Sequence, residues 1–598
     1  LPLTYFDRVP IMLGIGYADW AAIATYMVIV TAAGLWAGRQ VQGMRDFVMP
    51  RTFGKLFMMM HSFGTATHSD QAVTVASKCY TSGLSGIWYQ LQWLFATPFF
   101  WLIAPMMRRF RAITMANVFE LRYNRSVAYL FVVVGLLKFT VNLGLMLWGT
   151  SAVMDACSGG QLPARQLVLI MTLLFVSYGL VGGLRAAIVT DFIQGILVVV
   201  FSFILLLPLL NHLGGWTAVQ DTVLELKDSP DFLSLANPKI TIFYIVMISL
   251  NAFLGVVVQP QNLGVCAAGK TEIDGAVGFM CGTMLKRFCT VAWAMTAMAA
   301  VALYGTRGTV IEHPDQIYGM LAREFLPAMM PGLLGIFIAS LLATVMGSCD
   351  SFMVSAAGLV AENLYRPLFP NESPRHYLKV ARISGLLVVA SGLAFAFWLG
   401  DKDRGVVGGL EVLWKIGAMM SVAFWMGVFW RGATSAGAWA ATLTAFLIWL
   451  FTSSTLGANL LANIPLCHDW GIVTEKIVDG STVMAVVLPW QMVFYLVGSL
   501  LAGILVSLKT QPPAHSKNEH DARLDQFYSL LRTPVQEGEE PPGPCQLPPE
   551  VTPGPRHVFL PETRLEIPIP GRRAILGFSA GWACVIAMLA GIYWFIAR

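Results

Sequence analysis

The stretch HSFGTATHSDQAVTV, residues 61–75, is too polar for the apolar segment in which it lies. That segment runs from about residue 54 to 77 and is long enough to cross a membrane, yet its middle carries Gly64, His68, Ser69, Asp70 and Gln71. Glycine weakens a continuous helix, and non-helical backbone at that depth is tolerated only where it is buried by protein or lines a cavity. We therefore expect a broken helix whose gap faces a central site.

A second stretch has the same character. SLNAFLGVVVQPQNLG, residues 249–264, places glycine, glutamine, asparagine and a helix-breaking proline inside the apolar segment 240–268. The two broken segments head two blocks of five apolar segments each, residues 54–212 and 240–430. Because five is odd, consecutive blocks have opposite orientations. Paired broken helices at the head of inverted repeats indicate the central site of a secondary transporter.

The composition is that of an all-α integral membrane protein. Of the 598 residues 56% are hydrophobic and only 12% are charged, with a mean hydropathy of +0.65, whereas soluble domains carry about 25% charged residues. The apolar segments are near 20 residues or longer, which suits helices that cross about 30 Å and not barrel strands of about 10 residues. Fourteen such segments lie at about 18–38, 54–77, 83–107, 127–156, 165–183, 186–211, 240–268, 276–305, 331–364, 378–400, 408–430, 434–452, 484–508 and 573–597.

The remaining chain falls into five regions outside the two blocks. They are an N-terminal region with an extra first helix and a cytoplasmic loop (1–53), an outer loop (213–239), two additional helices (431–508), a proline-rich cytoplasmic loop (509–572) and a final helix (573–598). Within the proline-rich loop, Leu524, Phe527 and Leu531 have helical spacing and predict a short amphipathic helix. A weakly ordered linker is the alternative.

Basic residues predict the orientation of the chain. Arg and Lys gather in the loops at 39–55, 108–125 and 366–382, which share one side if every segment crosses. The alternate loops, among them 212–239 and 453–483, are longer and poorer in basic residues. By the positive-inside rule the first group is cytoplasmic, so we expect an inner or plasma membrane protein with both termini outside.

The segment FIASLLATVMGSCDSF, residues 337–352, carries a carboxylate, Asp350, inside an apolar run. Burying it costs about 2.5–3.5 kcal/mol even on the lenient insertion scale. Positions 344, 347, 348, 350 and 351 share one arc of about 160° on a helix, and their oxygens suit a small hard cation. A second acid, Asp191, begins another apolar segment. A protonated structural aspartate is the alternative, and a proton shared by the two acids would make proton coupling the rival of sodium.

Several ordered motifs then resemble one known family, the sodium–solute symporters, and in particular their sodium–glucose cotransporter branch. The motifs are YMVIVTAAGLWAGR (26–39), ITMANVFELRYNR (113–125), VTDFIQ (189–194), AENLYRP (361–367) and GVFWRGATSAGAWAA (427–441). The resemblance implies a leucine-transporter-type 5+5 inverted repeat with about 14 transmembrane helices, which works by alternating access.

The resemblance also implies the cation sites. The main sodium site of the family joins the first broken helix to the helix at 331–364 and lies beside an aspartate. In this sequence those positions are Gly64, Thr67, Thr344, Gly347, Ser348 and Asp191. The family commonly has serine where this chain has Gly347, so one hydroxyl is missing. Asp191, Asp350 and Ser351 match a second sodium site that some members possess, with a carboxylate in place of one hydroxyl.

Substrate residues carry over from the sugar-transporting members. The polar positions that match are Gln71, Gln92, Asn251 and Lys286, and His68 and Asp70 lie in the unwound stretch. An expected glutamine is replaced by Leu410, which places a hexose in doubt and leaves a small polar organic solute, with a lean toward a sugar.

The sequence thus predicts a sodium-coupled symporter that imports a small polar solute with one or two sodium ions. Proton-coupled symport, exchange, and a solute sensor without transport are the alternatives. The motifs H-E-x-x-H and C-x-x-C are absent from the sequence. We therefore expect no enzyme and no organic cofactor, and we expect a protein that works as a monomer in the lipid bilayer, without a nucleic-acid partner.

Overall fold

Most of the computed structural model is helical, and it describes residues 11–39, 41, 43–401, 406–478, 481–513, 517–539 and 541–596. Within these residues, ten helices are long and apolar enough to cross a membrane. They are α1 (Tyr17–Gly38), α8 (Arg125–Ser158), the second part of α9 (Ala164–Ile204) with α10 (Leu206–Leu213), α14 (Glu272–Thr306), α16 (Leu333–Val360) with η5 (Ala361–Tyr365) and α17 (Arg366–Leu368), α18 (Pro374–Asp401), α19 (Val406–Ala418) with α20 (Ser421–Phe429), α21 (Ser435–Ser453), α24 (Leu488–Lys509) and α26 (Arg572–Phe595).

The other expected spans coincide with shorter helices. Residues 54–77 contain α3 (Lys55–Ala66) and α4 (Ser69–Ser82), residues 83–107 contain η1 (Leu84–Ile87), α5 (Trp88–Leu91) and α6 (Thr97–Arg109), and residues 240–268 contain α12 (Ile242–Gly255), η3 (Val256–Val258) and α13 (Asn262–Ala267). The all-helical class is confirmed, whereas the fourteen crossings and the two inverted blocks stay predictions.

A single glycine separates two of the expected spans. Residues 165–183 and 186–211 were expected as two helices, and they meet within α9 at Gly183, whose φ of 56° and ψ of −151° are not helical. A side chain at Gly183 would press on Phe47 of the short helix α2 (Met44–Val48). Because L-residues avoid this backbone conformation and the space is filled, the turn depends on glycine.

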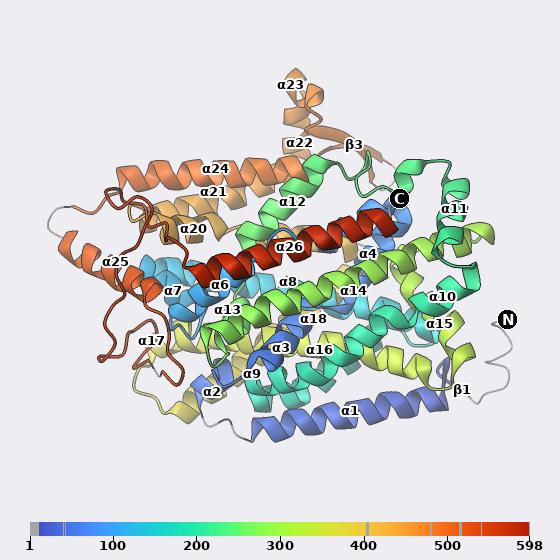
Figure 1. The fold of residues 1–598 in the computed structure, drawn as a ribbon, viewed down its shortest axis with the longest axis horizontal. Coiled ribbons are helices and arrows are strands. Elements are labelled where there is room, and N and C mark those ends of the chain that lie inside the picture. The colour runs from blue at the N-terminus through green and yellow to red at the C-terminus, as the bar shows by residue number, and fades with distance from the viewer. Residues whose placement is uncertain are drawn as a thin grey trace.

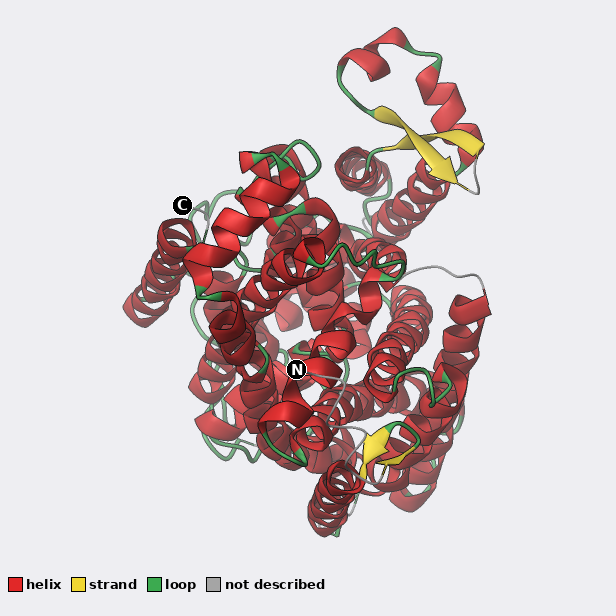
Figure 2. Cartoon of the chain, turned by 90° about the vertical axis from the view of Figure 1, so that its right-hand side faces the viewer, coloured by secondary structure: helices red, strands yellow, loops and turns green. Residues whose placement is uncertain are grey.

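The helices form a bundle around α16, whose side chains are almost all buried, in contact with α9, α8 and α1 (Figure 1). Large apolar side chains remain exposed on the outer helices α1, α18, α24 and α26, for example Trp36, Leu387, Leu501 and Ile586. Exposed apolar surface of this kind indicates a face that contacts lipid. Figure 2 looks along the helix axes and shows them packed side by side.

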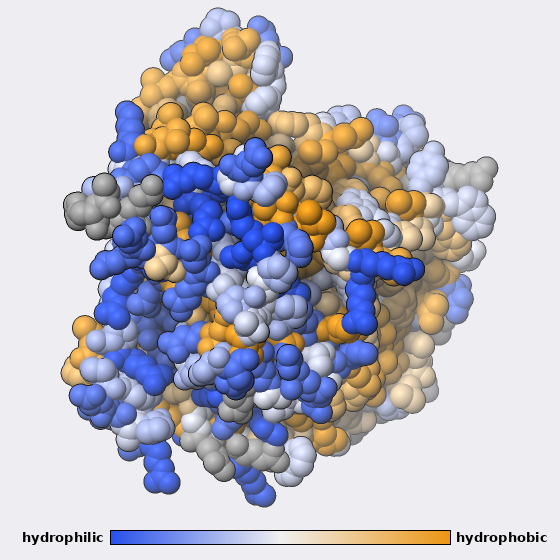
Figure 3. Space-filling view, turned by 60° about the vertical axis from the view of Figure 1, so that its left-hand side comes forward, coloured by the Kyte–Doolittle hydropathy of each residue, from blue (hydrophilic) through white to orange (hydrophobic). Residues whose placement is uncertain are grey.

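The three basic loops lie together at one end of the bundle, on the left in Figure 1, which we call the basic end. The loop helices α2, α7 (Met115–Arg122) and α17 lie there, and hydrophilic side chains gather over this end in Figure 3. The start of α1 and the end of α26 lie at the opposite end, in agreement with termini on one side of the membrane.

The opposite end carries elements that the hydropathy pattern did not predict. These are α11 (Trp216–Lys227), η2 (Pro230–Leu233), η4 (Pro314–Gln316), α15 (Ile317–Met329), α22 (Thr455–Ala462), α23 (Pro465–Asp469), the short pair β1 (Ile11–Met12) and β2 (Ile15–Gly16), and the antiparallel hairpin β3 (Val473–Val478) and β4 (Ser481–Val486). The hairpin projects from the bundle in Figure 2. The span expected from residue 484 therefore begins later, at Leu488, because residues up to 486 pair in β4.

The proline-rich loop is fastened to the basic end. Its helix α25 (Lys517–Arg532) buries Leu524 and Phe527 against the protein, as the amphipathic spacing predicted. Beyond it, Glu539 accepts from Arg111 at 2.5 Å and Glu566 accepts from Arg431 at 2.8 Å. The proline-rich composition cannot form a core of its own, but the polar and apolar contacts order the loop along the surface of the bundle.

Candidate functional site

The two broken helices open toward the same cavity. Between α3 and α4, Thr67 and His68 have extended backbone, with φ of −116° and −112°. Between η3 and α13, Gln259 is also extended with a φ of −76° and ψ of 114°, and Pro260 follows without a backbone N–H. His68 and Gln259 both line one cavity of about 110 Å³. The backbone therefore unwinds where protein, and not lipid, surrounds it.

Four of the residues predicted for the main sodium site lie together. The hydroxyl of Ser348 on α16 donates to the carbonyl oxygen of Gly64 at 3.2 Å. Asp191 on α9 is fully buried, and a Cβ built on Gly64 would lie 3.0 Å from its Oδ1. A Cβ at Gly347 would collide with the same oxygen. The carbonyl, the hydroxyl and the carboxylate thus surround one point between α3, α9 and α16.

The packing around Gly347 explains why this position has no side chain. The sequence analysis counted this position as the loss of a hydroxyl ligand. In the structure the space that a side chain would fill is taken by Oδ1 of Asp191 and by the side-chain amide of Gln194. The glycine therefore exchanges a hydroxyl for the close approach of a carboxylate.

The hydroxyls of the two threonines predicted for this site make no hydrogen bond to Gly64, Ser348 or Asp191 among the described residues. The hydroxyl of Thr67 is buried and has no hydrogen-bond partner among the described residues. Thr344 lies one turn before Ser348 on α16, and its hydroxyl donates to Leu341 O at 2.7 Å. The oxygen of each hydroxyl retains lone pairs, so both remain available as acceptors toward a cation.

The three residues predicted for a second cation site do not form one compact cluster. Ser351 contacts Thr65 (Oγ to Oγ1, 3.3 Å), Thr65 contacts Nδ1 of His61 at 3.3 Å, and this Nδ1 contacts Oδ2 of Asp191 at 2.7 Å. An imidazole and a hydroxyl thus stand between Asp191 and Ser351. Asp350 faces the first part of α9, where a Cβ at Gly179 would collide with its Oδ1.

His61 is a residue that the sequence analysis missed. It lies one helical turn before Gly64 in the stretch that first indicated a broken helix, and it is fully buried. Helical spacing was the signal that could have found it, because positions 61, 64 and 65 share one face of α3.

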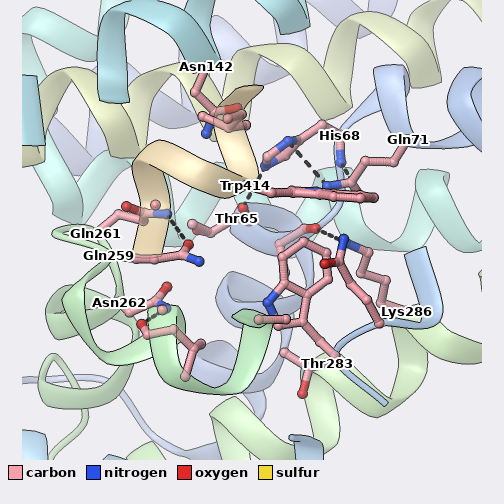
Figure 4. Close-up of a pocket in the computed structure, with 18 of the residues that line it drawn as sticks. Thr65, His68, Gln71, Asn142, Gln259, Gln261, Asn262, Thr283, Lys286 and Trp414 are labelled. Carbon is pink, nitrogen blue, oxygen red and sulfur yellow. Dashed lines mark hydrogen bonds between the residues drawn. The ribbon is translucent and has the colours of Figure 1, made fainter. Parts of the chain in front are cut away.

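All six residues predicted to contact a solute line the central cavity: His68, Asp70, Gln71, Gln92, Asn251 and Lys286. Figure 4 shows several of them around the gap in the first broken helix. Lys286 on α14 donates from Nζ to Ala66 O at 2.5 Å, which satisfies the last turn of α3. His68 contacts Thr65 O through Nε2 at 2.9 Å, and Gln71 contacts His68 Nδ1 at 3.3 Å. These three side chains therefore brace the unwound backbone as well as line the cavity.

Two other predicted residues differ in the hydrogen-bonding groups that they have available for a ligand. The amide of Asn251 is engaged by the framework, since its Oδ1 accepts from Tyr495 at 2.5 Å and its Nδ2 donates to Trp414 O at 3.2 Å. Gln92 donates to Tyr89 O at 3.1 Å, but its Oε1 has no partner among the described residues. Gln92 thus retains an acceptor for a ligand.

Lys138 on α8 also lines this cavity, and the sequence analysis did not single it out. It is 5% exposed, and its ammonium nitrogen has no hydrogen-bond partner among the described residues. Asn142, one turn later on the same helix, also lines the cavity, and its Oδ1 has no hydrogen-bond partner in the part of the chain that the structure describes. A lysine in the middle of an apolar segment was the available signal, because such groups mark functional sites.

The basic residues of the cavity outnumber the acidic ones. Lys138, Lys286 and Arg287 line it, with Asp70 as the one carboxylate among its lining residues. Arg287 donates to Gln90 O at 3.0 Å and Lys286 to Ala66 O, so backbone carbonyls hold these two cations. Lys138 is left as a buried amino group that has no hydrogen-bond partner among the described residues.

Comparison of the sequence with known proteins identifies the family of this chain. The sodium:solute symporter family model matches residues 47–445. The chain is 25% identical over 458 residues to the high-affinity proline transporter of Bacillus subtilis, covering 72% of this chain and 92% of that protein. It is also 25% identical over 419 residues to the sodium/pantothenate symporter of Haemophilus influenzae, covering 66% of this chain and 80% of that protein.

The fold has a counterpart among solved structures. A Na⁺-coupled sialic acid symporter, described in a substrate-bound outward-open state, matches with a TM-score of 0.68 at 16% identity, covering 83% of this chain and 99% of that chain. The expected sodium–glucose branch is not singled out, since these relatives are named for proline and pantothenate. The family-model match spans most of the chain, and the protein therefore belongs to the sodium:solute symporter family.

Proposed function

We propose that this protein is a sodium-coupled symporter that takes up a small organic anion by alternating access. The observation that carries the proposal is that the unwound segment between α3 and α4 borders both the proposed cation site and the solute cavity. Gly64 at the end of α3 faces Ser348 and Asp191, while Thr65 and His68 line the solute cavity. A cation that orders this segment also shapes the cavity, which is the physical requirement for coupling.

The proposed main sodium ligands are the oxygens of Gly64, Thr67, Thr344 and Ser348, with Asp191 beside them in the space left by Gly347. These are hard oxygen donors around a buried carboxylate, a set that suits a small hard cation. A second ion between Asp191, Asp350 and Ser351 remains part of the proposal. It requires His61 or Thr65 to move, because they stand between Asp191 and Ser351.

The basic end is proposed to face the cytoplasm, with both termini outside. One sodium ion that enters at a membrane potential of 100 mV supplies about 2.3 kcal/mol, and a tenfold sodium gradient adds about 1.4 kcal/mol. Together these support a few hundredfold accumulation of a solute that adds no charge of its own. A monovalent anion cancels the charge of one sodium ion, so strong accumulation of an anion favours two ions.

The solute class follows from Lys138. An ammonium group buried without a counter-charge is unfavourable, and a carboxylate on the solute relieves that cost. Asn142 and Gln92 add acceptors for hydroxyl or amide groups of the solute. Proline, pantothenate and sialic acid, for which the relatives are named, each carry a carboxylate. The lean toward a neutral sugar is accordingly replaced by a small organic acid.

The test uses the purified full-length protein and its thermal unfolding midpoint. Each acid is compared with the analogue that lacks its carboxylate charge, namely pantothenate with pantothenyl alcohol, proline with prolinol, and sialic acid with its methyl ester. NaCl is compared with KCl and choline chloride at equal ionic strength. We expect stabilisation by sodium over the other cations, and further stabilisation by at least one acid but not by its partner.

Lys138 variants separate the two parts of the proposal. Lys138→Met should abolish the preference for the acid and keep the sodium response, and Lys138→Arg should retain both. Lys270→Met, which changes an exposed lysine, is the matched control. Equal responses to sodium, potassium and choline would exclude sodium coupling, and a response to pH alone would favour proton coupling. An acid preference that survives in Lys138→Met would exclude the proposed solute contact.

A further inference from the structure

A small lobe projects sideways from the bundle, at the end opposite the basic end. We call residues 455–478 and 481–486 the side lobe; it consists of α22, α23, β3 and β4, and lies between α21 and α24 in the sequence. The long helices run across Figure 1, and α22 and α23 rise above them. In Figure 2, along the helix axes, the side lobe again lies beside the bundle. It therefore extends along the plane of the membrane and not away from it.

The side lobe has a hydrophobic core of its own. Ala458 and Cys467, from its two helices, are buried together with Ile472, Val473 and Val486 of the hairpin segment. Val473 and Val486 are also partners in the strand ladder. The side lobe is therefore a defined unit of structure, and apolar side chains that lie outside this core need another explanation.

Five large apolar side chains lie outside that core, each between 46% and 68% exposed. They are Leu456, Leu460, Ile464, Leu466 and Trp470. All of them lie on or next to α22 and α23, and residues 455–464 contain no Asp, Glu, Lys or Arg. By contrast, the exposed residues of β3 include Glu475 and Lys476. The helical part of the side lobe is thus its apolar part.

This apolar surface continues a surface that faces lipid. Leu447, Leu450 and Phe451 are exposed on α21, a helix that is long and apolar enough to cross a membrane. Only Ser454 separates the end of α21 from the start of α22. The turn is tight, since a Cβ at Gly457 would lie 2.0 Å from Phe451 O. The exposed apolar residues of α22 therefore follow directly on the lipid-facing residues of α21.

Aromatic rings mark the junction between the side lobe and the bundle. The ring of Trp470 lies 5.9 Å from that of Trp490, and the ring of Trp490 lies 5.0 Å from that of Phe243, measured between centroids. Trp490 is in the first turn of α24 and Phe243 is in the first turn of α12. Tryptophan is enriched where a membrane meets water. The rings therefore indicate that the side lobe lies at the level of the membrane surface.

The side lobe presents apolar side chains toward the basic end. Figure 3 views the molecule largely from that end, and the part that projects at the top is mostly apolar from this direction. Because the side lobe lies at the opposite end of the bundle, a surface turned toward the basic end is turned toward the bilayer. Apolar surface in such a position is suited to contact with lipid.

We propose that the side lobe is a membrane-surface anchor, in which α22 and α23 lie on the lipid leaflet beside the bundle and insert the five exposed apolar side chains among the lipids. Helices of this kind lie in the plane of the interface with their apolar side buried at the boundary between headgroups and acyl chains. Through Trp490 and Phe243 the anchor reaches the start of α12. It therefore helps to fix the depth of the second broken helix in the bilayer.

The test places a bimane fluorophore at single positions of the full-length protein, which is labelled in detergent and transferred to phosphatidylcholine nanodiscs. Leu460→Cys reports on the apolar helices, and Thr474→Cys reports on an exposed position of β3. The native protein, treated in the same way, gives the background from its own cysteines. A phosphatidylcholine with a nitroxide near its headgroup should quench position 460 at least threefold more than position 474. Iodide in the buffer should show the reverse preference.

A second substitution tests whether the apolar side chains cause the contact. Leu456→Asp adds a charge one helical turn before the reporter at position 460 and should reduce its quenching by the lipid nitroxide at least twofold. Thr482→Asp, which adds the same charge at an exposed position of β4, is the matched control and should leave the quenching unchanged. Unchanged iodide quenching of Thr474→Cys in the presence of Leu456→Asp would show that the side lobe remains folded.

Three results would overturn the proposal. Equal quenching of both positions by iodide would show that the apolar helices face water. Protection of position 460 from both quenchers would show that protein covers it, such as a second copy of this chain. Nitroxide quenching that is unchanged in Leu456→Asp would show that the apolar side chains do not hold the side lobe on the lipid. None of these measurements depends on sodium or on transport, so their outcome is independent of the proposed function.

Discussion

Nδ1 of His61 lies 2.7 Å from Oδ2 of Asp191, with both side chains buried between α3 and α9. The contact fastens the first broken helix to the helix that carries the proposed sodium carboxylate. Thr65 extends it to Ser351 on α16, so three helices meet through four side chains. This chain of contacts lies next to Gly64 O and links the proposed cation site to the framework.

Replacing His61 by leucine should destabilise the protein. The change leaves one oxygen of a buried carboxylate without its donor, at a cost of about 1–3 kcal/mol. His61→Asn keeps an N–H at nearly the same place as Nδ1 and should retain most of the stability. The unfolding midpoint in sodium-free buffer measures both variants. Equal midpoints for His61→Leu, His61→Asn and native protein would show that the contact contributes nothing.

Adding a methyl group at Gly347 should impair sodium binding. The new Cβ would collide with Oδ1 of Asp191 and displace the carboxylate. We expect the half-saturating NaCl concentration for thermal stabilisation to rise at least tenfold in Gly347→Ala. The control is Gly408→Ala, because a Cβ at Gly408 meets nothing within 4 Å. A sodium response unchanged from native would separate Gly347 from the cation site.

Ser348→Ala should weaken the same response by removing a proposed ligand. Its hydroxyl contacts Gly64 O, whereas the hydroxyl of Ser340 on the same helix donates to Ile336 O at 2.8 Å within α16. Ser340→Ala is therefore the matched control and should behave as native. If both variants lose sodium stabilisation to the same extent, the effect belongs to α16 in general and not to the site.

Asp350→Asn tests the number of ions. The amide keeps the shape of the side chain but removes its charge, so a second cation loses its main attraction. The stabilisation curve against NaCl should become shallower, with a Hill coefficient that falls toward about one, while sodium still stabilises. A curve of unchanged steepness would leave a single sodium ion and a structural role for Asp350.

The thiol of Cys545 reports whether the proline-rich loop is fastened. Burial raises its pKa to about 12, so at pH 8 hardly any reactive thiolate is present. In Glu539→Gln, which loses the charged contact with Arg111, exposure should lower the pKa toward an ordinary thiol value of about 8.5. Maleimide labelling of Cys545 should then rise steeply between pH 7 and 9, as thiolate forms.

Two controls complete that experiment. Glu537→Gln changes an exposed carboxylate in the same loop and should label as slowly as the native protein. A variant that also carries Cys545→Ala identifies the site of labelling. Equal rates for Glu539→Gln and native protein across this pH range would mean that the contact with Arg111 does not hold the loop.

The pattern of residues along the sequence was sufficient to predict much of this structure. Hydropathy alone predicted where the long apolar helices lie, because a bilayer demands about 20 apolar residues for each crossing. The polar interruptions at 61–75 and 249–264 predicted the unwound segments, and the six residues expected at a solute lie on one cavity. These features depend on local composition and on helical period, which a sequence displays directly.

Long-range placement needed the folded chain. Nothing near His61 in the sequence shows that it meets Asp191, 130 residues later, and nothing near Gly347 shows that a carboxylate fills the space beside it. Lys138 gains its meaning only from its burial at the solute cavity without a hydrogen-bond partner among the described residues. Such features depend on which side chains the packing of distant helices brings together and on how completely that packing excludes water, and no local period in the sequence encodes either.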